Sequence, residues 1–451
     1  MNIKKILRYF ILIIAYLLLI VGFISGIIVV TGGQNLVFGV LNIILSSISC
    51  ISFIFYLVIA LIAAGLHDRD RKFWIIPLVL VIPIIIMNSM PLIAGISAPI
   101  NSAETQFKAA FGDNYMSLIK PELRAKLRSS PFEFWRMYNG LEDLQYNVSY
   151  NQGPYLTDPT SGDKFYFDYY RPISGSGPFP VLINIHGGAW TIGNKGIENL
   201  VFYSRYFASQ GYVVFDLQYG LAHFPGEKIF GYDVDPLLSQ VQGLLGRSLT
   251  KRSYTVQEMI VQILGNFTDY LVANAGKYHA NISCVFVTGL SAGGQLTETF
   301  IGWNTTWRNV FNDSVKIRGI IPRYGPCDFK DLFSTHMNDP IVGIDPNFDD
   351  LMEKAFGGNP VTDDSLNRLI SPLYYVNKSA PPCLFLQGIQ DALAPVEEAR
   401  MLQAAYKANA TSPFILIEFP FVGHMFDTIP TSPAGQIALY YWERFMAILQ
   451  S

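Results

Sequence analysis

Residues 284–294 read CVFVTGLSAGG, an apolar run followed by a serine that is set between glycines. The run that ends at Thr288 predicts a buried β-strand, and the residues after Ser291 predict the start of a helix. The pattern G-x-S-x-G between a strand and a helix is typical of a nucleophile elbow, a sharp turn that exposes the serine hydroxyl. Gly289 and Gly293 fit such a turn because side chains at these positions would collide with the adjoining strand and helix. We therefore predict that Ser291 is a nucleophile at the carboxyl end of a buried strand.

Similar short apolar runs recur between residues 146 and 451, and helical patterns separate most of them. The runs predict strands at Lys164–Tyr170, Val181–Ile185, Tyr212–Leu217, Cys284–Thr288, Ile317–Pro322, Cys383–Gln387 and Phe414–Phe419. The clearest helical patterns cover Gln257–Tyr278, Ala292–Ile301, Val396–Lys407 and Gly435–Leu449. Strands that alternate with helices in this way predict an α/β fold with a mainly parallel central sheet.

A second glycine-rich motif, IHGGAW at residues 185–190, follows the apolar strand pattern VLINI. The motif resembles the HGGG-type loop of esterases and lipases, which implies that the backbone N–H groups of Gly187 and Gly188 point at an oxygen that becomes negative during acyl transfer. Ala292 adds a third N–H group, because it follows Ser291 at the positive end of the predicted helix. The sequence thus predicts an oxyanion hole beside the nucleophile. The residues that we expect to support the two motifs are His186, Trp190, Gly289 and Gly293.

Four motifs now stand in order along the chain: HGGAW, GLSAGG, GIQDAL at residues 388–393 and GHMF at residues 423–426. Together they resemble the hormone-sensitive-lipase and carboxylesterase branch of the α/β-hydrolases, and they are similar to feruloyl-esterase-like and prenylcysteine-methylesterase-like members. The resemblance covers roughly residues 146–451. It implies the α/β-hydrolase fold and a serine hydrolase that needs no metal or organic cofactor.

The resemblance and the chain order also place the two residues that complete a catalytic triad with Ser291. Asp391 follows the strand pattern CLFLQ and matches the family pattern G-x-x-D-x-L, whereas His424 follows FILIEF and matches G-H-x-F. Both residues lie just beyond the carboxyl ends of predicted strands, where ligands meet sheets of this kind. Asp328, in YGPCDF, is the competing acid, and we interpret it as a turn or cap residue because a long insertion follows it.

The first hundred residues differ in composition from the rest of the chain. Tyr9–Leu66 and Phe73–Ile100 contain no charged residue, although 15% of the whole chain is charged. A helix needs about 20 apolar residues to cross a bilayer. Three stretches meet this requirement, and they predict an all-helical membrane segment within residues 1–100, with helices at about 6–30, 36–65 and 73–98. Prolines interrupt the third stretch, so a re-entrant segment is the alternative there.

Basic residues lie before the first stretch and in the HDRDRK loop at residues 67–72, whereas the first loop has none. The positive-inside rule therefore predicts that the N-terminus and this loop are cytoplasmic and that three crossings leave the catalytic domain on the extracellular or luminal side. A cleaved signal peptide is the alternative interpretation of the first stretch. The N-x-S/T sequons slightly favour an extracellular or luminal catalytic domain, since all of them follow the predicted membrane segment. They lie at Asn147, Asn266, Asn281, Asn304, Asn312, Asn377 and Asn409.

Three parts are expected in the chain: the membrane segment at 1–100, a helical connector or lid at 101–145, and a catalytic domain at 146–451. Insertions at about 222–254 and 330–372 interrupt the strand–helix alternation, and we expect them to form loops or a cap over the elbow. These insertions are rich in aromatic and apolar residues. An apolar cap beside a membrane favours hydrophobic acyl or lipid esters as substrates.

We therefore expect a membrane-anchored serine hydrolase that cleaves carboxylic esters through an acyl-enzyme on Ser291. An acyltransferase with the same triad and a serine peptidase of the prolyl-oligopeptidase type are the alternatives. The expected partners are a small-molecule ester or lipid and the bilayer itself. A formal net charge of −3 argues against nucleic acid as a partner. The four cysteines follow no metal-ligand spacing.

Overall fold

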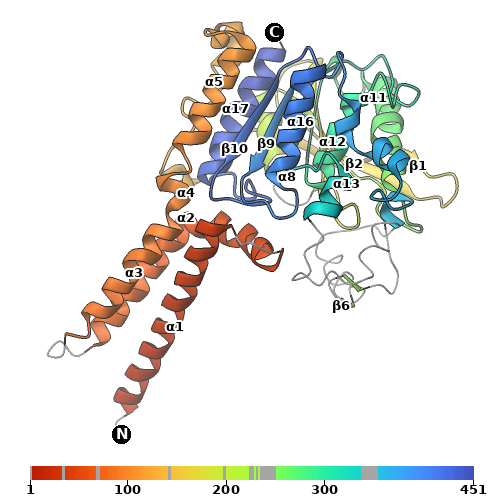
Figure 1. Ribbon diagram of the computed structural model, residues 1–451. Coiled ribbons are helices and arrows are strands. Elements are labelled where there is room, and N and C mark those ends of the chain that lie inside the picture. Colours follow the sequence, from red (N-terminus) through yellow and green to blue (C-terminus); the bar gives the residue numbers. More distant parts are fainter. Residues whose placement is uncertain are drawn as a thin grey trace.

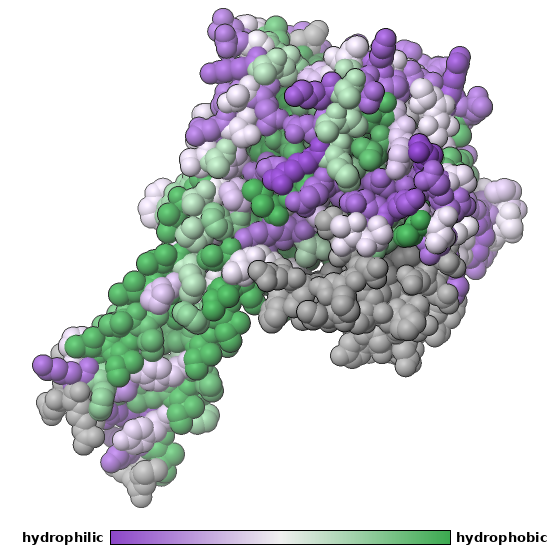
Figure 2. Space-filling model, viewed as in Figure 1, coloured by the Kyte–Doolittle hydropathy of each residue, from purple (hydrophilic) through white to green (hydrophobic). Residues whose placement is uncertain are grey.

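The computed structural model describes residues 3–32, 36–67, 72–140, 144–196, 200–222, 228–229, 232–233, 250–336 and 354–450. Figure 1 shows an N-terminal group of helices that projects from a layered α/β body, and the C-terminus lies in that body. In Figure 2 the projecting helices present an almost continuous hydrophobic surface, whereas the visible face of the body carries many hydrophilic residues. The contrast in composition along the sequence is therefore also a contrast between two regions of the molecule.

The first two apolar stretches form the helices α1 (Ile3–Thr31) and α2 (Leu36–Leu66). Helix α1 has 29 residues and is long and apolar enough to cross a bilayer. A helix of this composition near the N-terminus also fits a signal sequence. Helix α2 is bent by 78° between Leu41–Ser49 and Ile51–Leu66, so it qualifies as a span only if both parts are taken together.

The third apolar stretch is not the single helix that the sequence predicted. It is divided into α3 (Ile75–Asn88), α4 (Met90–Ile93) and the first turn of α5 (Ser97–Phe111). The 14 residues of α3 rise by about 21 Å, which is less than the roughly 30 Å of a bilayer core. Pro91 lies in the first turn of α4, where it fits a helix start better than a helix interior. The prediction of three spanning helices is therefore not confirmed.

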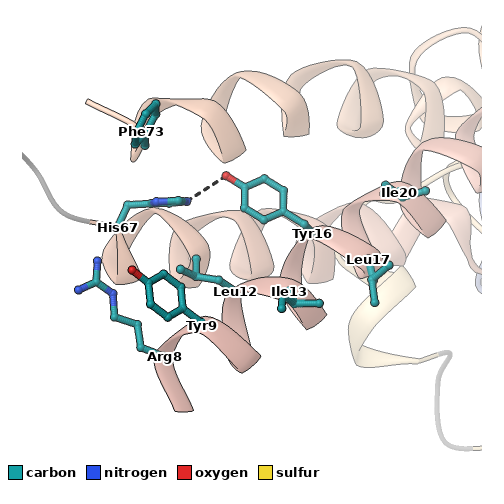
Figure 3. A pocket seen from close by; sticks show the side chains of 9 residues that line it. All are labelled: Arg8, Tyr9, Leu12, Ile13, Tyr16, Leu17, Ile20, His67 and Phe73. Carbon is teal, nitrogen blue, oxygen red and sulfur yellow. Dashed lines mark hydrogen bonds between the residues drawn. The ribbon is translucent and has the colours of Figure 1, made fainter. Parts of the chain in front are cut away.

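A cavity of about 650 Å³ lies beside α1 among the N-terminal helices, and Figure 3 shows the residues that line it. Its lining includes Arg8 and Phe73, and in its wall the Tyr16 hydroxyl and His67 Nε2 are 3.0 Å apart. None of the predicted catalytic residues lines this cavity. It is therefore separate from the predicted active site.

An eight-stranded sheet forms the centre of the body, in the order β1-β2-β4-β3-β7-β8-β9-β10. From β4 to β10 the neighbouring strands are parallel, whereas β2 is antiparallel to both β1 and β4. The sequence predicted each of these strands except β1, which has no continuous apolar run and is mostly exposed. The bounds are β1 (Tyr146–Thr157), β2 (Lys164–Pro172), β3 (Phe179–Ile185), β4 (Val213–Leu217), β7 (Ala280–Leu290), β8 (Ile317–Arg323), β9 (Cys383–Gly388) and β10 (Phe414–Phe419).

Apolar side chains of the inner strands alternate between the two faces of the sheet. Val181 and Ile183 belong to one hydrophobic cluster and Leu182, between them, belongs to the other. The first cluster includes residues of α10 (Val256–Ile260), a π-helical stretch (Val261–Phe267), α11 (Thr268–Asn274), α12 (Ala292–Glu298) and α16 (Val396–Asn409). The second includes residues of α5, α8 (Leu200–Gln210) and α17 (Pro433–Leu449). Helices thus cover both faces of the sheet, and the inner strands therefore bury apolar side chains on both sides.

The stretch at 101–145 packs on the body through α5 and several short helices. Phe107 of α5 is fully buried, and its ring centroid lies 5.3 Å from that of Tyr441 in α17. The side chain of Gln106 accepts a hydrogen bond from the N–H of Leu416 and donates one to its carbonyl, at 2.9 and 2.7 Å. Because Leu416 lies in the edge strand β10, Gln106 satisfies backbone groups that no further strand covers. The short helices are a 3₁₀ helix (Tyr115–Leu118), α6 (Pro121–Arg124) and α7 (Arg136–Asn139).

The predicted insertions at 222–254 and 330–372 lie in large part outside the described residues. The described part of the first holds the short strands β5 (Lys228–Ile229) and β6 (Tyr232–Asp233). The described part of the second begins within α13 (Phe329–Asp331) and continues with a π-helical turn (Leu332–His336). It also includes α15 (Asp364–Ile370) and ends at the start of a 3₁₀ helix (Pro372–Tyr375). The role of these insertions as a cap stays a prediction.

Candidate active site

Ser291 occupies the turn between β7 and α12, with φ 55° and ψ −121°. This backbone conformation is unusual for a residue with a side chain and is typical of functional sites. A Cβ atom added at Gly289 would lie 2.1 Å from the Gly293 carbonyl oxygen, and one at Gly293 would lie 2.3 Å from the Ile185 oxygen. The N–H of Ser291 donates to the carbonyl oxygen of Arg323 in β8 at 2.9 Å. The predicted elbow is therefore present, and its neighbouring strands leave room only for glycine.

The HGG loop directly follows β3 and lies against the elbow. A Cβ atom added at Gly187 would lie 3.2 Å from Ser291 Cβ. Gly188 has a φ of 114°, and the next two residues, Ala189 and Trp190, also have positive φ values of 49° and 61°. This run of positive φ values turns the backbone sharply next to Ser291. The structure thus brings the predicted oxyanion-hole loop and the predicted nucleophile together.

His186 and Trp190 hold the two ends of this loop. The ring of His186 stacks on Tyr219 with a centroid distance of 4.2 Å, and the Tyr219 hydroxyl donates to the His186 carbonyl oxygen at 2.8 Å. Trp190 Nε1 donates to Gln295 Oε1 in α12 at 3.1 Å, which ties the loop to the helix after Ser291. Both side chains are buried. Their contacts fit the supporting role that the sequence predicted.

Asp391 and His424 lie in the loops that follow β9 and β10, and they face each other. His424 Nδ1 is 2.8 Å from Asp391 Oδ2. The other oxygen, Oδ1, accepts hydrogen bonds from the N–H groups of Leu393 and Ala394, both at 2.9 Å. Gln387 Nε2 is a further donor to Asp391 Oδ2, at 3.2 Å. The carboxylate is therefore fixed in the orientation in which it receives an Nδ1–H from the imidazole.

Asp328, the competing acid, has a different task. It precedes α13, and its side chain accepts hydrogen bonds from the N–H groups of Lys330 and Asp331. Asn367 Nδ2 and the Tyr374 hydroxyl also donate to it, each at 3.0 Å. This is the geometry of a helix N-cap, so the interpretation of Asp328 as a cap residue is confirmed.

An ion pair connects β8, the neighbour of the elbow strand β7, to the histidine loop, and the sequence did not reveal it. Arg323 Nη1 is 2.5 Å from Asp427 Oδ2, and both side chains are buried. The Tyr324 hydroxyl donates to the other oxygen of Asp427 at 2.7 Å, while the Tyr324 ring packs edge-on against His424 with centroids 4.7 Å apart. Since the carbonyl of Arg323 also binds the N–H of Ser291, these residues join the nucleophile turn to the histidine loop. The position of Asp427 three residues after His424 was the only signal.

Two buried glutamates lie behind the site. Burial raises the pKa of Glu398 to about 7, although Glu398 Oε2 accepts hydrogen bonds from the N–H groups of Cys327 and Asp328 at 2.7 and 2.8 Å. Burial and the nearby charge of Glu398 raise the pKa of Glu298, on α12, well above its ordinary value. Among the described residues, no group of three or more histidine, cysteine or acidic side chains is arranged to hold a metal ion.

Similarity to known proteins identifies the family of this chain. A family model described as BD-FAE matches residues 167–230 and 259–406. The chain is 25% identical over 276 residues to the probable carboxylic ester hydrolase LipM of Mycobacterium tuberculosis, with 60% of this chain and 55% of that protein covered. It is 24% identical over 266 residues to esterase LipC of the same organism, with 58% and 56% covered. The chain therefore spans about half the length of the curated relatives that it matches.

A solved structure of an inhibited esterase B from Lactobacillus rhamnosis has the same fold. It aligns with a TM-score of 0.50 at 17% identity, over 70% of this chain and 91% of that one. At this identity the likeness bears on the fold alone. Together with the strand order, the turn at Ser291 and the matched family model, it shows that the chain belongs to the α/β-hydrolases, in the hormone-sensitive-lipase-like and feruloyl-esterase-like group that BD-FAE describes.

Proposed function

We propose that the chain is a membrane-anchored serine hydrolase that cleaves carboxylic esters through an acyl-enzyme on Ser291. The observation that carries the proposal is the buried pair of His424 and Asp391 at the carboxyl ends of the last two strands of the sheet. The strained turn at Ser291 and the glycine loop beside it supply the other parts that acyl transfer needs. The curated relatives, which are named as a probable carboxylic ester hydrolase and an esterase, support an ester as the substrate class.

In the first half of the reaction, the Ser291 hydroxyl attacks the ester carbonyl carbon while His424 Nε2 takes its proton. Asp391 keeps the proton of His424 on Nδ1 and stabilises the imidazolium that forms. The backbone N–H groups of Gly187, Gly188 and Ala292 stabilise the tetrahedral oxyanion, and one such donor typically contributes about 3 kcal/mol in the transition state. The imidazolium then protonates the leaving alcohol, and the acyl group stays on Ser291.

In the second half, His424 takes a proton from water, and the resulting hydroxide equivalent attacks the acyl carbonyl. The carbon–oxygen bond to Ser291 breaks, His424 returns the proton to the serine oxygen, and the carboxylic acid leaves. Each turn of the cycle consumes one ester and one water and releases an alcohol and a carboxylic acid.

The apolar surroundings of the site favour an ester with a hydrophobic acyl group. The Trp190 ring, in the loop beside Ser291, packs edge-on against Phe329 and Phe356 with centroid distances of 5.3 Å in both cases. Phe333 stacks on Phe329 and extends this aromatic group. The hydrophobic helices at the N-terminus would hold the enzyme at a membrane, where such esters are found.

The proposal is tested with a fluorophosphonate probe and a series of p-nitrophenyl esters of increasing chain length. We expect the probe to modify Ser291 and the wild-type enzyme to hydrolyse the esters. We expect Ser291→Ala to lose both properties, with turnover reduced by several powers of ten and an almost unchanged unfolding temperature. Esterase activity above about a tenth of the wild-type value in Ser291→Ala would identify another nucleophile and overturn the proposal.

A further inference from the structure

The loop that carries the predicted catalytic acid contacts the membrane segment directly. Gln390, the residue before Asp391, donates from Nε2 to the carbonyl oxygen of Val30 in the last turn of α1, at 3.0 Å. Its other amide atom, Oε1, accepts a hydrogen bond from Asn42 Nδ2 of α2 at 3.3 Å. Asn42 is fully buried, and a buried amide in an apolar membrane helix is costly enough to indicate a specific role. One glutamine side chain thus binds both membrane helices.

Close packing around Gln390 also joins the N-terminal helices to the loops that carry Asp391 and His424. A Cβ atom added at Gly39 of α2 would lie 2.3 Å from Ala392 Cβ, so α2 touches the residue after Asp391. One added at Gly32 would lie 2.8 Å from the Gln390 side chain. One added at Gly423, next to His424, would lie 3.1 Å from Asn42 Nδ2. Both the acid loop and the histidine loop therefore rest on the junction between α1 and α2.

The length of α1 gives the depth of this contact in a membrane. Its 29 residues rise by about 44 Å, which matches the roughly 40–45 Å of a bilayer with its head groups. Val30 is the penultimate residue of α1, so the contact with Gln390 lies near the head-group level of one leaflet. Figure 1 shows the same relation, with the upper end of α1 lying against the body. Exposed apolar side chains also lie near the site, at Ile192 after the glycine loop and at Ile389 in the acid loop.

From these contacts we propose that the substrate is a lipid ester resident in the leaflet at the C-terminal end of α1, and that the α1–α2 junction holds the active site at the level of its ester group. The ester carbonyls of membrane lipids lie between the hydrocarbon core and the head groups, directly beneath the level of the Gln390 contact. The inference rests on the proposed function, because the leaflet lipid must meet Ser291. The membrane segment is then a part of the substrate site as well as an anchor.

The test uses the full chain in phosphatidylcholine vesicles and three serine-reactive phosphonates. One is short and water-soluble, the second is a diacyl lipid with the phosphonate in place of a glycerol ester, and the third carries the phosphonate at the far end of an acyl chain. Modification of Ser291 is followed by mass spectrometry. We expect the glycerol-level lipid probe to react about tenfold or more faster than the chain-end probe. Equal rates for the two lipid probes would overturn the inference.

A variant pair tests the role of the junction. Gly39→Ala adds a methyl group against Ala392, whereas Gly65→Ala, in the same helix, adds one with no other atom within 4 Å. Damage to the acid loop slows all probes alike, so the informative quantity is the rate for the glycerol-level probe divided by the rate for the soluble probe. We expect Gly39→Ala to lower this ratio about tenfold and Gly65→Ala to leave it unchanged. An unchanged ratio in Gly39→Ala would overturn this inference and leave the proposed function intact. Failure of the soluble probe to modify wild-type Ser291 would overturn both.

Discussion

His424 Nδ1 lies 2.8 Å from Asp391 Oδ2, and both side chains are buried. Asp391→Asn would place an amide where the imidazole needs an acceptor, so we expect turnover of a p-nitrophenyl ester to fall by a factor on the order of 10⁴. Asp328→Asn is the matched control, because Asp328 caps α13 and an asparagine caps a helix almost as well. The opposite ranking of the two variants would place the catalytic acid at Asp328.

The ion pair of Arg323 and Asp427 predicts a positioning effect. Asp427→Asn leaves the buried guanidinium without its counter-charge, which typically costs about 3–5 kcal/mol in stability. Because Asp427 also holds Tyr324 against His424, we expect kcat to fall about tenfold or more with KM almost unchanged. Denaturant unfolding and steady-state kinetics measure the two effects.

The control for Asp427 is Glu418→Gln, which breaks an exposed pair with Arg400 whose atoms are 2.7 Å apart. Exposed pairs contribute about 0–1 kcal/mol, so this variant should change neither quantity much. A normal kcat in Asp427→Asn, even with reduced stability, would show that the ion pair supports the fold alone.

The raised pKa of Glu398 predicts how stability depends on pH. Burial raises this pKa from 4.5 in the unfolded chain to about 7, so the folded state binds the proton more tightly than the unfolded state does. The contribution of Glu398 is therefore complete below about pH 4.5 and is lost as the pH rises through about 7. At about 1.4 kcal/mol for each pKa unit, the loss is on the order of 3 kcal/mol.

We expect the free energy of unfolding of the wild type to fall between about pH 5 and pH 8 and that of Glu398→Gln to fall less. Glu397→Gln is the control, because Glu397 is the exposed neighbour in the same helix. Denaturant titrations at several pH values provide the measurement. Identical pH profiles for the wild type and Glu398→Gln would contradict the prediction.

The orientation in the membrane is predicted from the basic residues Lys4, Lys5 and Arg8 at the start of α1 and from those that follow α2 in the sequence. Moving each charge through the hydrocarbon core costs a few kcal/mol on insertion scales, so these residues should stay cytoplasmic. We expect protease added to intact cells to digest a tag after Ser451 and to spare a tag before Met1. Protection of the C-terminal tag would mean that the chain crosses the membrane an even number of times or in the inverted sense. The division of the third stretch into α3 and α4 makes this measurement informative.

The inner strands were predictable because they are covered on both faces, which gives continuous apolar runs such as VLINI and CVFVT. Strand β1 was not predictable in this way, since it lies at the edge of the sheet and its residues are mostly exposed. The third apolar stretch was predicted as one helix because composition reports hydrophobicity but not helix ends. In the structure α3 ends before Ser89, and a new helix, α4, begins with Pro91 in its first turn.

In the site, too, residues within a local sequence motif were predictable and residues without one were not. Ser291, Asp391 and His424 each stand in a local motif after a strand, so the sequence alone could propose them. Asp427 has no such motif, because its role depends on Arg323, which is 104 residues away in the chain. The contact between Asn42 and Gln390 joins residues 348 positions apart. Long-range contacts of this kind leave no local pattern, and only the folded chain identifies them.

The two hydrogen bonds between Gln106 and Leu416 have a consequence for any attempt to separate the α/β body from the N-terminal helices. A truncated chain that starts at residue 144 would lose Gln106 and Phe107 and leave β10 with an uncovered edge beside an exposed apolar surface. Unprotected edges of this kind pair with other chains, so such a fragment should aggregate. A cut before Ser97 keeps α5 in place and closes that edge. A fragment without the N-terminal helices should therefore begin at the start of α5, about fifty residues before the first strand.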